Sequence, residues 1–281
     1  MRWMVALACL LISCSLSAQQ RIASLNLCTD LLLLELVERE RIASLTYWAA
    51  DPELSYLADR AVGLPLNQSL AEQIVPQRPD LVLAGQFSDV RVIALLERLG
   101  YPVAVMDVPL TLAGMREHIL AFGELVAEPE AARRMADALD HQLGGLSSRA
   151  RALESAEGSA PLAVVYGPQG VSPGTGTLMN DLLALAGYRN LAAEVGIVSY
   201  GTLPLEQLVR AQPTLLIVDD LSTNADSIAH HALRHPVLAG MFTPEQILEL
   251  PPSLTACVGP GAVDVVERLL DRRVRLAGSG P

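Results

Sequence analysis

The sequence has 281 residues, of which 51% are hydrophobic and 18% are charged, so the chain is long enough to bury two sizeable cores. Its formal net charge of −11 excludes the cationic surface that nucleic-acid binding requires. All 20 basic residues are arginine, which excludes the lysine chemistry of P-loops and Schiff bases.

Residues 1–18 have the order of a secretory signal peptide, with a basic start, an apolar run and then small residues. The apolar run from Trp3 to Ile12 is shorter than the roughly 20 residues that a helix needs to cross a bilayer. Two processing routes remain open. Ordinary cleavage would follow Ser17 or Ala18, whereas Leu11–Cys14 resembles a lipobox in which Cys14 would be lipidated. Either route predicts export, with a lipid anchor at most.

Residues 19–128 alternate short β-branched runs with helical patterns, which is typical of an α/β unit with parallel strands. Strands are expected at residues 21–26, 41–46, 80–84 and 102–106. Thr29 is expected to cap a helix that ends at Leu36. Another helix is expected from Val90 to Leu99, where Gly100 would stop it. We therefore predict an N-terminal α/β lobe.

Residues 129–156 predict one long helix. Pro129 holds the favoured first position, and apolar residues recur three or four apart from Met135 to Leu153. The Gly144-Gly145 pair would weaken the middle of this helix. An ordinary core helix is the alternative, but the α/β units on both sides favour a rigid link between two lobes.

Residues 157–276 predict a second α/β lobe. Strands are expected at residues 162–166 and 215–218, and helices at residues 177–186 and 262–276. The Gly- and Ser-containing tail at residues 277–281 is expected to be disordered.

An internal repeat relates the two predicted lobes. The segments Glu72–Leu83 and Glu206–Ile217 share Glu, Gln and Pro at the same offsets, and a Leu-Pro-Leu tripeptide precedes each. Helical periodicity alone would not place the same residues at the same offsets, so a duplicated α/β unit is the economical explanation. Two such lobes would form a ligand cleft between the carboxyl ends of their strands.

Aromatic side chains gather on the loops that would line this cleft, although only 4% of the sequence is aromatic. Aromatic walls suit a flat organic ligand because they offer a large apolar area with few rotatable bonds, although each ring could equally be core packing. The candidate ligand-binding residues, all on loops after predicted strands, are Asn26, Cys28, Tyr47, Trp48, Phe87, Tyr166, Tyr200 and Cys257.

The two cysteines in this set, Cys28 and Cys257, have three open interpretations. They could form a disulfide between the lobes, remain as buried thiols or contact a metal. A disulfide needs Cα atoms within about 7 Å of each other, which a sequence does not show.

The stretches Ser24–Asp30, Glu72–Leu83 and Asn190–Val218 resemble the class III periplasmic binding proteins, which include cobalamin-, siderophore- and haem-binding proteins. The resemblance runs from Arg21 to about Leu276. It implies a periplasmic protein, with two lobes tied by one helix, that captures a metal chelate for an ABC importer. Cobalt or iron would arrive with this ligand, so no resident cofactor is expected.

The resemblance also implies a partner, the permease dimer of the importer with its ATPase subunits. In the family, one glutamate on each lobe docks the permease, and the matching residues here are Glu72 and Glu206. Separated rim carboxylates would orient docking and speed encounter. The alternative is that each is simply an acid in the first turn of a helix.

Other patterns are weaker. Gly174-Thr175-Gly176 begins a dinucleotide-binding motif, but Met179 replaces its last glycine. The histidines at 230, 231 and 235 lie on one helical stretch rather than on a cleft loop, so no metal-ion site is predicted. We therefore predict a binding protein that is not an enzyme.

Two alternatives remain, an exported enzyme or metal-insertion protein on a related fold, and a ligand sensor without transport. An enzyme would need an acid–base pair from Asp107, Asp219 and Asp220. Few arginines fall on the cleft loops, which favours a corrinoid over a strongly anionic siderophore.

Overall fold

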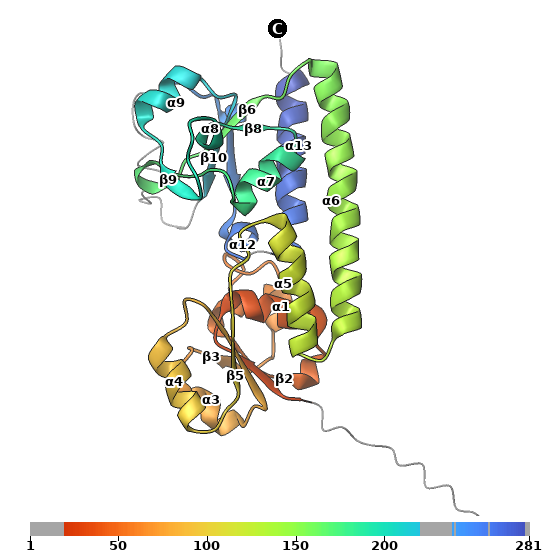
Figure 1. Ribbon diagram of the computed structural model, residues 1–281, viewed down its shortest axis with the longest axis vertical. Helices are drawn as coiled ribbons and strands as arrows, with labels where there is room; N and C mark the ends of the chain where they lie inside the picture. The colour runs from red at the N-terminus through yellow and green to blue at the C-terminus, as the bar shows by residue number, and fades with distance from the viewer. Residues whose placement is uncertain (1–19, 220–237, 239, 258, 279–281) are drawn as a thin grey trace, which may run out of the picture.

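The computed structural model describes residues 20–219, 238, 240–257 and 259–278. They form two α/β lobes joined by one long helix, as predicted (Figure 1). The predicted signal peptide, the lipobox cysteine Cys14, the three histidines at 230–235 and Asp220 lie outside this part of the chain. Within it, no helix combines the length and apolarity that a membrane span requires.

The N-terminal lobe is built on a five-stranded sheet in the order β3-β2-β1-β4-β5, and every pair in it is parallel. The strands are β1 (Ile22–Ser24), β2 (Ile42–Thr46), β3 (Leu66–Asn67), β4 (Leu81–Gly85) and β5 (Val103–Met106). The four predicted strands are confirmed to within two residues at each end. The fifth, β3, was not predicted because its two residues carry no strand pattern.

Helices cover both faces of this sheet. They are α1 (Leu27–Leu36), α2 (Ala58–Ala61), α3 (Ala71–Ile74), α4 (Val90–Arg98) and α5 (Leu112–Leu125). The predicted cap of α1 was wrong, because Asn26 holds that position and its side-chain oxygen accepts a hydrogen bond from the Cys28 N–H at 2.9 Å. Thr29 lies buried inside the helix, where its hydroxyl hydrogen-bonds with Ser24.

The C-terminal lobe has a four-stranded parallel sheet in the order β11-β10-β6-β8 and a separate antiparallel pair, β7 and β9. The strands are β6 (Leu162–Val165), β7 (Val171–Pro173), β8 (Arg189–Asn190), β9 (Tyr200–Thr202), β10 (Leu215–Asp219) and β11 (Ile247–Leu250). The α-helices are α7 (Leu178–Leu185), α8 (Leu191–Glu194), α9 (Leu205–Ala211), α12 (Pro252–Thr255) and α13 (Ala262–Gly278).

Short 3-10 helices lie in both lobes. The 3-10 helices are η1 (Arg39–Arg41), η2 (Tyr47–Ala50), η3 (Val75–Gln77), η4 (Pro168–Gly170) and η5 (Pro244–Gln246). The predicted disordered tail is partly wrong, because residues 277 and 278 continue α13, while residues 279–281 lie outside the described chain.

The duplication is visible in the topology. Strands β2-β1-β4-β5 of one lobe correspond in order to β8-β6-β10-β11 of the other. The repeated sequence segments form a helix that ends in a left-handed residue, Arg78 at φ 49° and Gln212 at φ 47°. A proline follows each of them, and the right-handed α conformation is disfavoured for a residue before proline, so the helix ends there. The same turn leads into β4 in one lobe and into β10 in the other.

The helix α6 (Pro129–Glu157) runs along both lobes (Figure 1). Its 29 residues correspond to roughly 43 Å at about 1.5 Å per residue. It packs against α5 of the first lobe and against α7 and α13 of the second. The residues that it buries there share one face and include Leu139, Leu143, Leu146 and Ala150.

Candidate ligand-binding cleft

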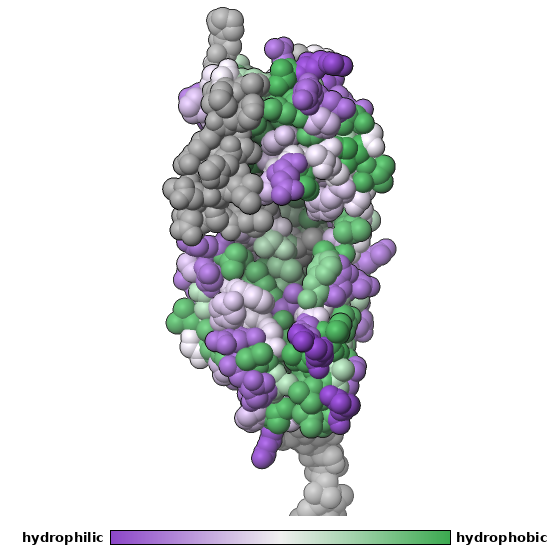
Figure 2. Space-filling view, turned by 90° about the vertical axis from the view of Figure 1, so that its left-hand side faces the viewer, coloured by the Kyte–Doolittle hydropathy of each residue, from purple (hydrophilic) through white to green (hydrophobic). Residues whose placement is uncertain are grey.

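An apolar cavity of about 390 Å³ lies between the lobes. Figure 2 shows that the surface is hollowed between them. The N-terminal lobe contributes the segment Val108–Leu110 that follows β5, and the C-terminal lobe contributes the remaining lining. None of the described residues that line the cavity is charged. Such a volume lies within the ~300–1,000 Å³ that is usual for small-molecule sites.

The wall from the C-terminal lobe follows from local structure. Thr177 caps α7 by accepting a hydrogen bond from the Asn180 N–H at 3.2 Å. The helix then directs Leu178, Met179 and Leu182 toward the cavity. The antiparallel pair of β7 and β9 places Val171 and Tyr200 in the lining, and α12 adds Leu254.

The structure brings two of the eight predicted ligand-binding residues, Tyr200 and Cys257, to the cavity wall. Tyr200 is 62% exposed, so its ring is accessible to a ligand in the cleft. Cys28 lies beside the cavity because it is bonded to Cys257, and Asn26 caps the same helix turn.

The other four predicted aromatics do not line the cavity. Tyr47 and Trp48 lie in η2 after β2, with ring centroids 4.9 Å apart. Phe87 follows β4 and is 83% exposed. Tyr166 follows β6 and is half-buried. Contact of these four with a ligand in the wider cleft stays a prediction.

The two glutamates predicted to dock a permease are exposed on equivalent short helices, Glu72 on α3 and Glu206 on α9. These helices belong to different lobes and lie at opposite ends of the molecule (Figure 1). Burial raises the pKa of the Tyr166 phenol, and the negative charge of Glu206 raises it further. Glu206 is thus close enough to the Tyr166 loop to influence its electrostatics.

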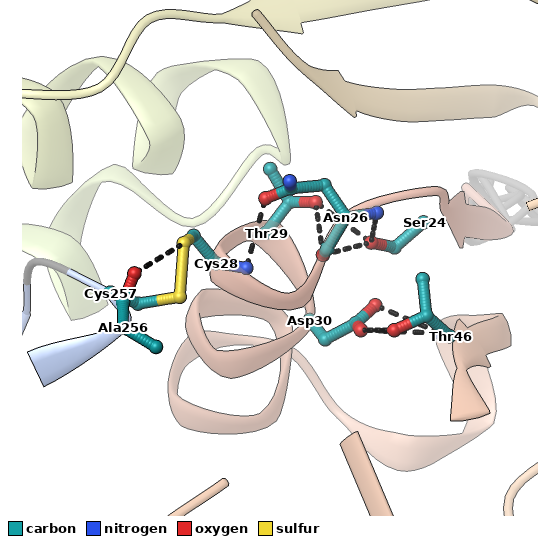
Figure 3. Close-up of a disulfide and its surroundings, with 8 residues drawn as sticks. All are labelled: Ser24, Asn26, Cys28, Thr29, Asp30, Thr46, Ala256 and Cys257. Carbon is teal, nitrogen blue, oxygen red and sulfur yellow. Dashed lines mark hydrogen bonds between the residues drawn. A yellow bond between two sulfur atoms is a disulfide. The ribbon is translucent and has the colours of Figure 1, made fainter. Parts of the chain in front are cut away.

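Cys28 and Cys257 form a disulfide, with Cα atoms 5.2 Å apart (Figure 3). Of the three interpretations left open by the sequence, the structure shows this one. Cys28 belongs to the first turn of α1 in the N-terminal lobe, and Cys257 follows α12 in the C-terminal lobe. The bond therefore ties the lobes together beside the cavity.

A buried carboxyl group supports the same turn of α1. The Asp30 carboxyl accepts hydrogen bonds from the N–H of Thr46, at 3.2 Å, and from its hydroxyl (Figure 3). Burial raises the pKa of Asp30 to about 7, although hydrogen bonds from Ser24 and Thr46 act in the opposite direction. Asp30 thereby links α1 to the end of β2.

Sequence reasoning missed most of the cavity lining. Leu178, Leu182 and Leu254 lie on helices and look like ordinary core residues in the sequence. No local signal distinguishes an apolar side chain that packs in the core from one that faces a cavity. Among the described residues, no group of three His, Cys, Asp or Glu side chains could hold a metal ion.

Comparison with known structures supports the observed architecture. The periplasmic haem-binding protein RhuT from Roseiflexus sp. RS-1 is 24% identical, with a TM-score of 0.71, over 90% of this chain and 99% of that chain. A periplasmic haem-binding protein from Pseudomonas aeruginosa is 21% identical, with a TM-score of 0.73, over 93% and 94%. The vitamin B12-binding protein BtuF of Vibrio cholerae is 17% identical, with a TM-score of 0.64, over 93% and 98%.

No curated protein matches the chain. A family model does match its sequence. The family model described as periplasmic binding protein matches residues 22–243, which is most of the chain and includes parts of both lobes. With this match, and with the one long helix that connects the lobes in the described part of the chain, the protein belongs to the periplasmic binding protein family, in class III.

Proposed function

We propose that the protein is the periplasmic substrate-binding component of an ABC importer and that it captures a metal chelate of low net charge, a corrinoid in the first place. The observation that carries the proposal is the uncharged, apolar cavity between the two lobes. Relatives of the same fold are described as binding haem or vitamin B12. The protein would bind its ligand without converting it.

The lining supports some ligand classes better than others. A strongly anionic siderophore needs cationic partners, since an unpaired charge is costly to bury. An apolar wall instead favours the face of a macrocycle, with Tyr200 offering both a ring and a hydroxyl group. These properties support a corrinoid ahead of an anionic siderophore, with haem as the nearest competitor because its macrocycle also offers an apolar face.

The test is equilibrium binding of defined ligands to the purified protein. Cyanocobalamin, haemin and ferrichrome would each be titrated, with absorbance changes and co-elution in gel filtration as readouts. We expect cyanocobalamin to form a one-to-one complex with the protein. The bound ligand should not be converted, so no product should be released. Preferential binding of haemin would overturn the corrinoid assignment, and failure of all three ligands to bind would overturn the proposal.

A further inference from the structure

The disulfide is a second covalent connection between the lobes. The chain passes from one lobe to the other through α6, and the bond joins residues 229 positions apart in the sequence. One of its two residues, Cys257, also lines the cavity. A change in this bond would therefore act at the ligand site itself.

The support on the N-terminal lobe is firm. The side chain of Asn26 accepts a hydrogen bond from Cys28 N–H, and the Thr29 hydroxyl donates to the Asn26 carbonyl at 2.9 Å (Figure 3). Asn26 also packs against β4, since a Cβ at Gly85 would lie 2.8 Å from its Cγ. Cys28 is thus held in a fixed position relative to the sheet.

The segment on the other lobe is short. The helix α12 has a single turn, with local hydrogen bonds from Leu254 N–H to the Pro251 carbonyl and from Ala256 N–H to the Pro252 carbonyl. The turn follows β11 after Pro251, and the disulfide joins its C-terminal end to the N-terminal lobe. The bond is therefore one of the contacts that position Leu254–Cys257.

We infer that the Cys28–Cys257 disulfide positions the cavity wall formed by Leu254–Cys257, so that oxidation preforms the ligand site and reduction weakens ligand binding. Only the ligand part of this inference rests on the proposed function. Reduction by a dithiol would transfer two electrons, break the Sγ–Sγ bond and add a hydrogen to each sulfur, while the reductant closes to a cyclic disulfide. The released wall would spend less time in the binding geometry, and apparent affinity falls in proportion to that fraction.

The binding test compares oxidised wild type, wild type reduced with dithiothreitol, and the double variant Cys28→Ser, Cys257→Ser. Each is titrated with cyanocobalamin, haemin and ferrichrome. We expect the dissociation constant to rise about tenfold on reduction and by a similar factor in the double variant. The matched control is the double variant with dithiothreitol. It lacks the Cys28–Cys257 bond, so any change in its affinity reports an effect of dithiothreitol on the ligand. Equal affinity in all three proteins would overturn the inference.

A second measurement does not depend on any ligand. Amide hydrogen exchange should rise in Leu254–Cys257 on reduction, while amides of β4 and β10 keep their protection. A uniform rise over both lobes would mean that the bond only stabilises the fold, which would contradict the inference. If wild type binds none of the three ligands, the proposed function fails, and hydrogen exchange alone still decides whether the disulfide positions the wall.

Discussion

At the scale of single residues, polar side chains at the carboxyl ends of β1, β2 and β3 are fully buried yet hydrogen-bonded. The Asn67 side-chain amide donates to the Ser24 carbonyl and to the Ser44 hydroxyl, both at 2.9 Å. Buried polar groups are costly without such partners. These bonds fix the ends of β1 and β3 relative to the middle of β2. Asp30 joins Thr46 at the end of β2 to α1, which carries Cys28.

Asp30 should make stability depend on pH. Its pKa of about 7 in the folded protein exceeds the ordinary 3.8, so between these values the folded state holds a proton that the unfolded state has lost. The contribution of Asp30 to the free energy of unfolding is therefore largest below pH 3.8. It falls between pH 3.8 and about pH 7, by at most about 1.4 kcal/mol per pH unit. Asp30→Asn removes this titration.

Urea unfolding from pH 4 to pH 9 would measure the effect. The stability of wild type minus that of Asp30→Asn should decrease from about pH 4 to about pH 7 and level off above. A difference that stays constant over the whole range would contradict the assignment. Both proteins lose the same contributions from the other carboxylates, so each serves as the reference for the other.

The cavity wall offers a matched pair of substitutions. Val171 and Val195 belong to the same lobe and are 42% and 40% exposed, but only Val171 lines the cavity. Val171→Glu should weaken binding of the ligand that the wild-type protein binds by about tenfold or more, because the bound ligand would strip water from the new carboxylate. Val195→Glu should leave the dissociation constant unchanged. Equal effects in a binding titration would show that Val171 does not contact the ligand.

The sequence predicted the chemistry of single residues better than their positions. The aromatic loop residues were recognised from composition, but only Tyr200 reached the cavity wall. Aliphatic lining such as Leu182 has the same helical spacing as core residues. The disulfide was one of three alternatives because the distance between Cys28 and Cys257 depends on how the lobes meet.

At the scale of elements, α6 is anchored to each lobe by a buried arginine. Arg41 donates to the Glu128 carboxylate at 2.6 Å, one residue before the helix begins. Arg273 on α13 donates to the Gly187 carbonyl at 2.9 Å and lies 3.5 Å from the Ala150 carbonyl of α6. A guanidinium can donate several hydrogen bonds at once, which suits a buried junction between elements.

The glycine pair in α6 is not required by packing. A Cβ at Gly144 or at Gly145 would meet no atom within 4 Å, and neither has a positive φ. Gly144→Ala should therefore stabilise the protein by roughly 0.5–1 kcal/mol, because glycine loses more backbone entropy in a helix. Thermal unfolding would show a higher midpoint. Gly158, at φ 83°, is the control, since Gly158→Ala should lower the midpoint.

Strands of four or five apolar residues were predictable because burial on both faces leaves a continuous apolar run. The long helix was predictable because burial on one face leaves apolar residues three or four apart. The strands β3 and β8 have two residues each, too few for any periodicity. The cap of α1 was misplaced because Asn26 and Thr29 are both good capping residues. Competition for hydrogen bonds decides between them, and Thr29 is already bonded to Ser24.

At the scale of the whole molecule, several contacts limit how far the lobes can separate. Besides α6 and the disulfide, the Leu112 N–H at the start of α5 donates to the Asp181 carboxylate of α7 at 3.1 Å. Tyr56 of the N-terminal lobe also lies against Gly261 of the other lobe, since a Cβ there would be 3.6 Å from its ring. We therefore expect ligand binding to involve modest lobe closure.

Duplication was readable from the sequence, but the unequal shares of the lobes in the cavity were not. The repeated segments fixed equivalent helices and strands, as Arg78 and Gln212 show. The cavity depends instead on parts without a repeat partner, above all α12 and the pair of β7 and β9. Such parts are positioned by long-range packing, which leaves no pattern in the local sequence.

The same duplication supports a two-point docking prediction. Glu72 and Glu206 are exposed in the first turns of equivalent helices, one in each lobe. A permease dimer could therefore engage both at once. Replacing either by alanine should slow association with the permease complex roughly threefold to tenfold at low ionic strength and leave ligand affinity unchanged. Since screening removes exposed charge effects, the difference should shrink at high salt.

Surface plasmon resonance with the permease complex in nanodiscs would measure these rates. Glu97→Ala and Glu267→Ala are matched controls, because each removes one exposed helical carboxylate from the same lobe as its counterpart. If all four variants slow association equally, the effect reflects net charge alone, and docking through Glu72 and Glu206 is wrong. If the double variant Glu72→Ala, Glu206→Ala slows association more than either single variant does, both glutamates contribute to docking, because each attracts the permease independently.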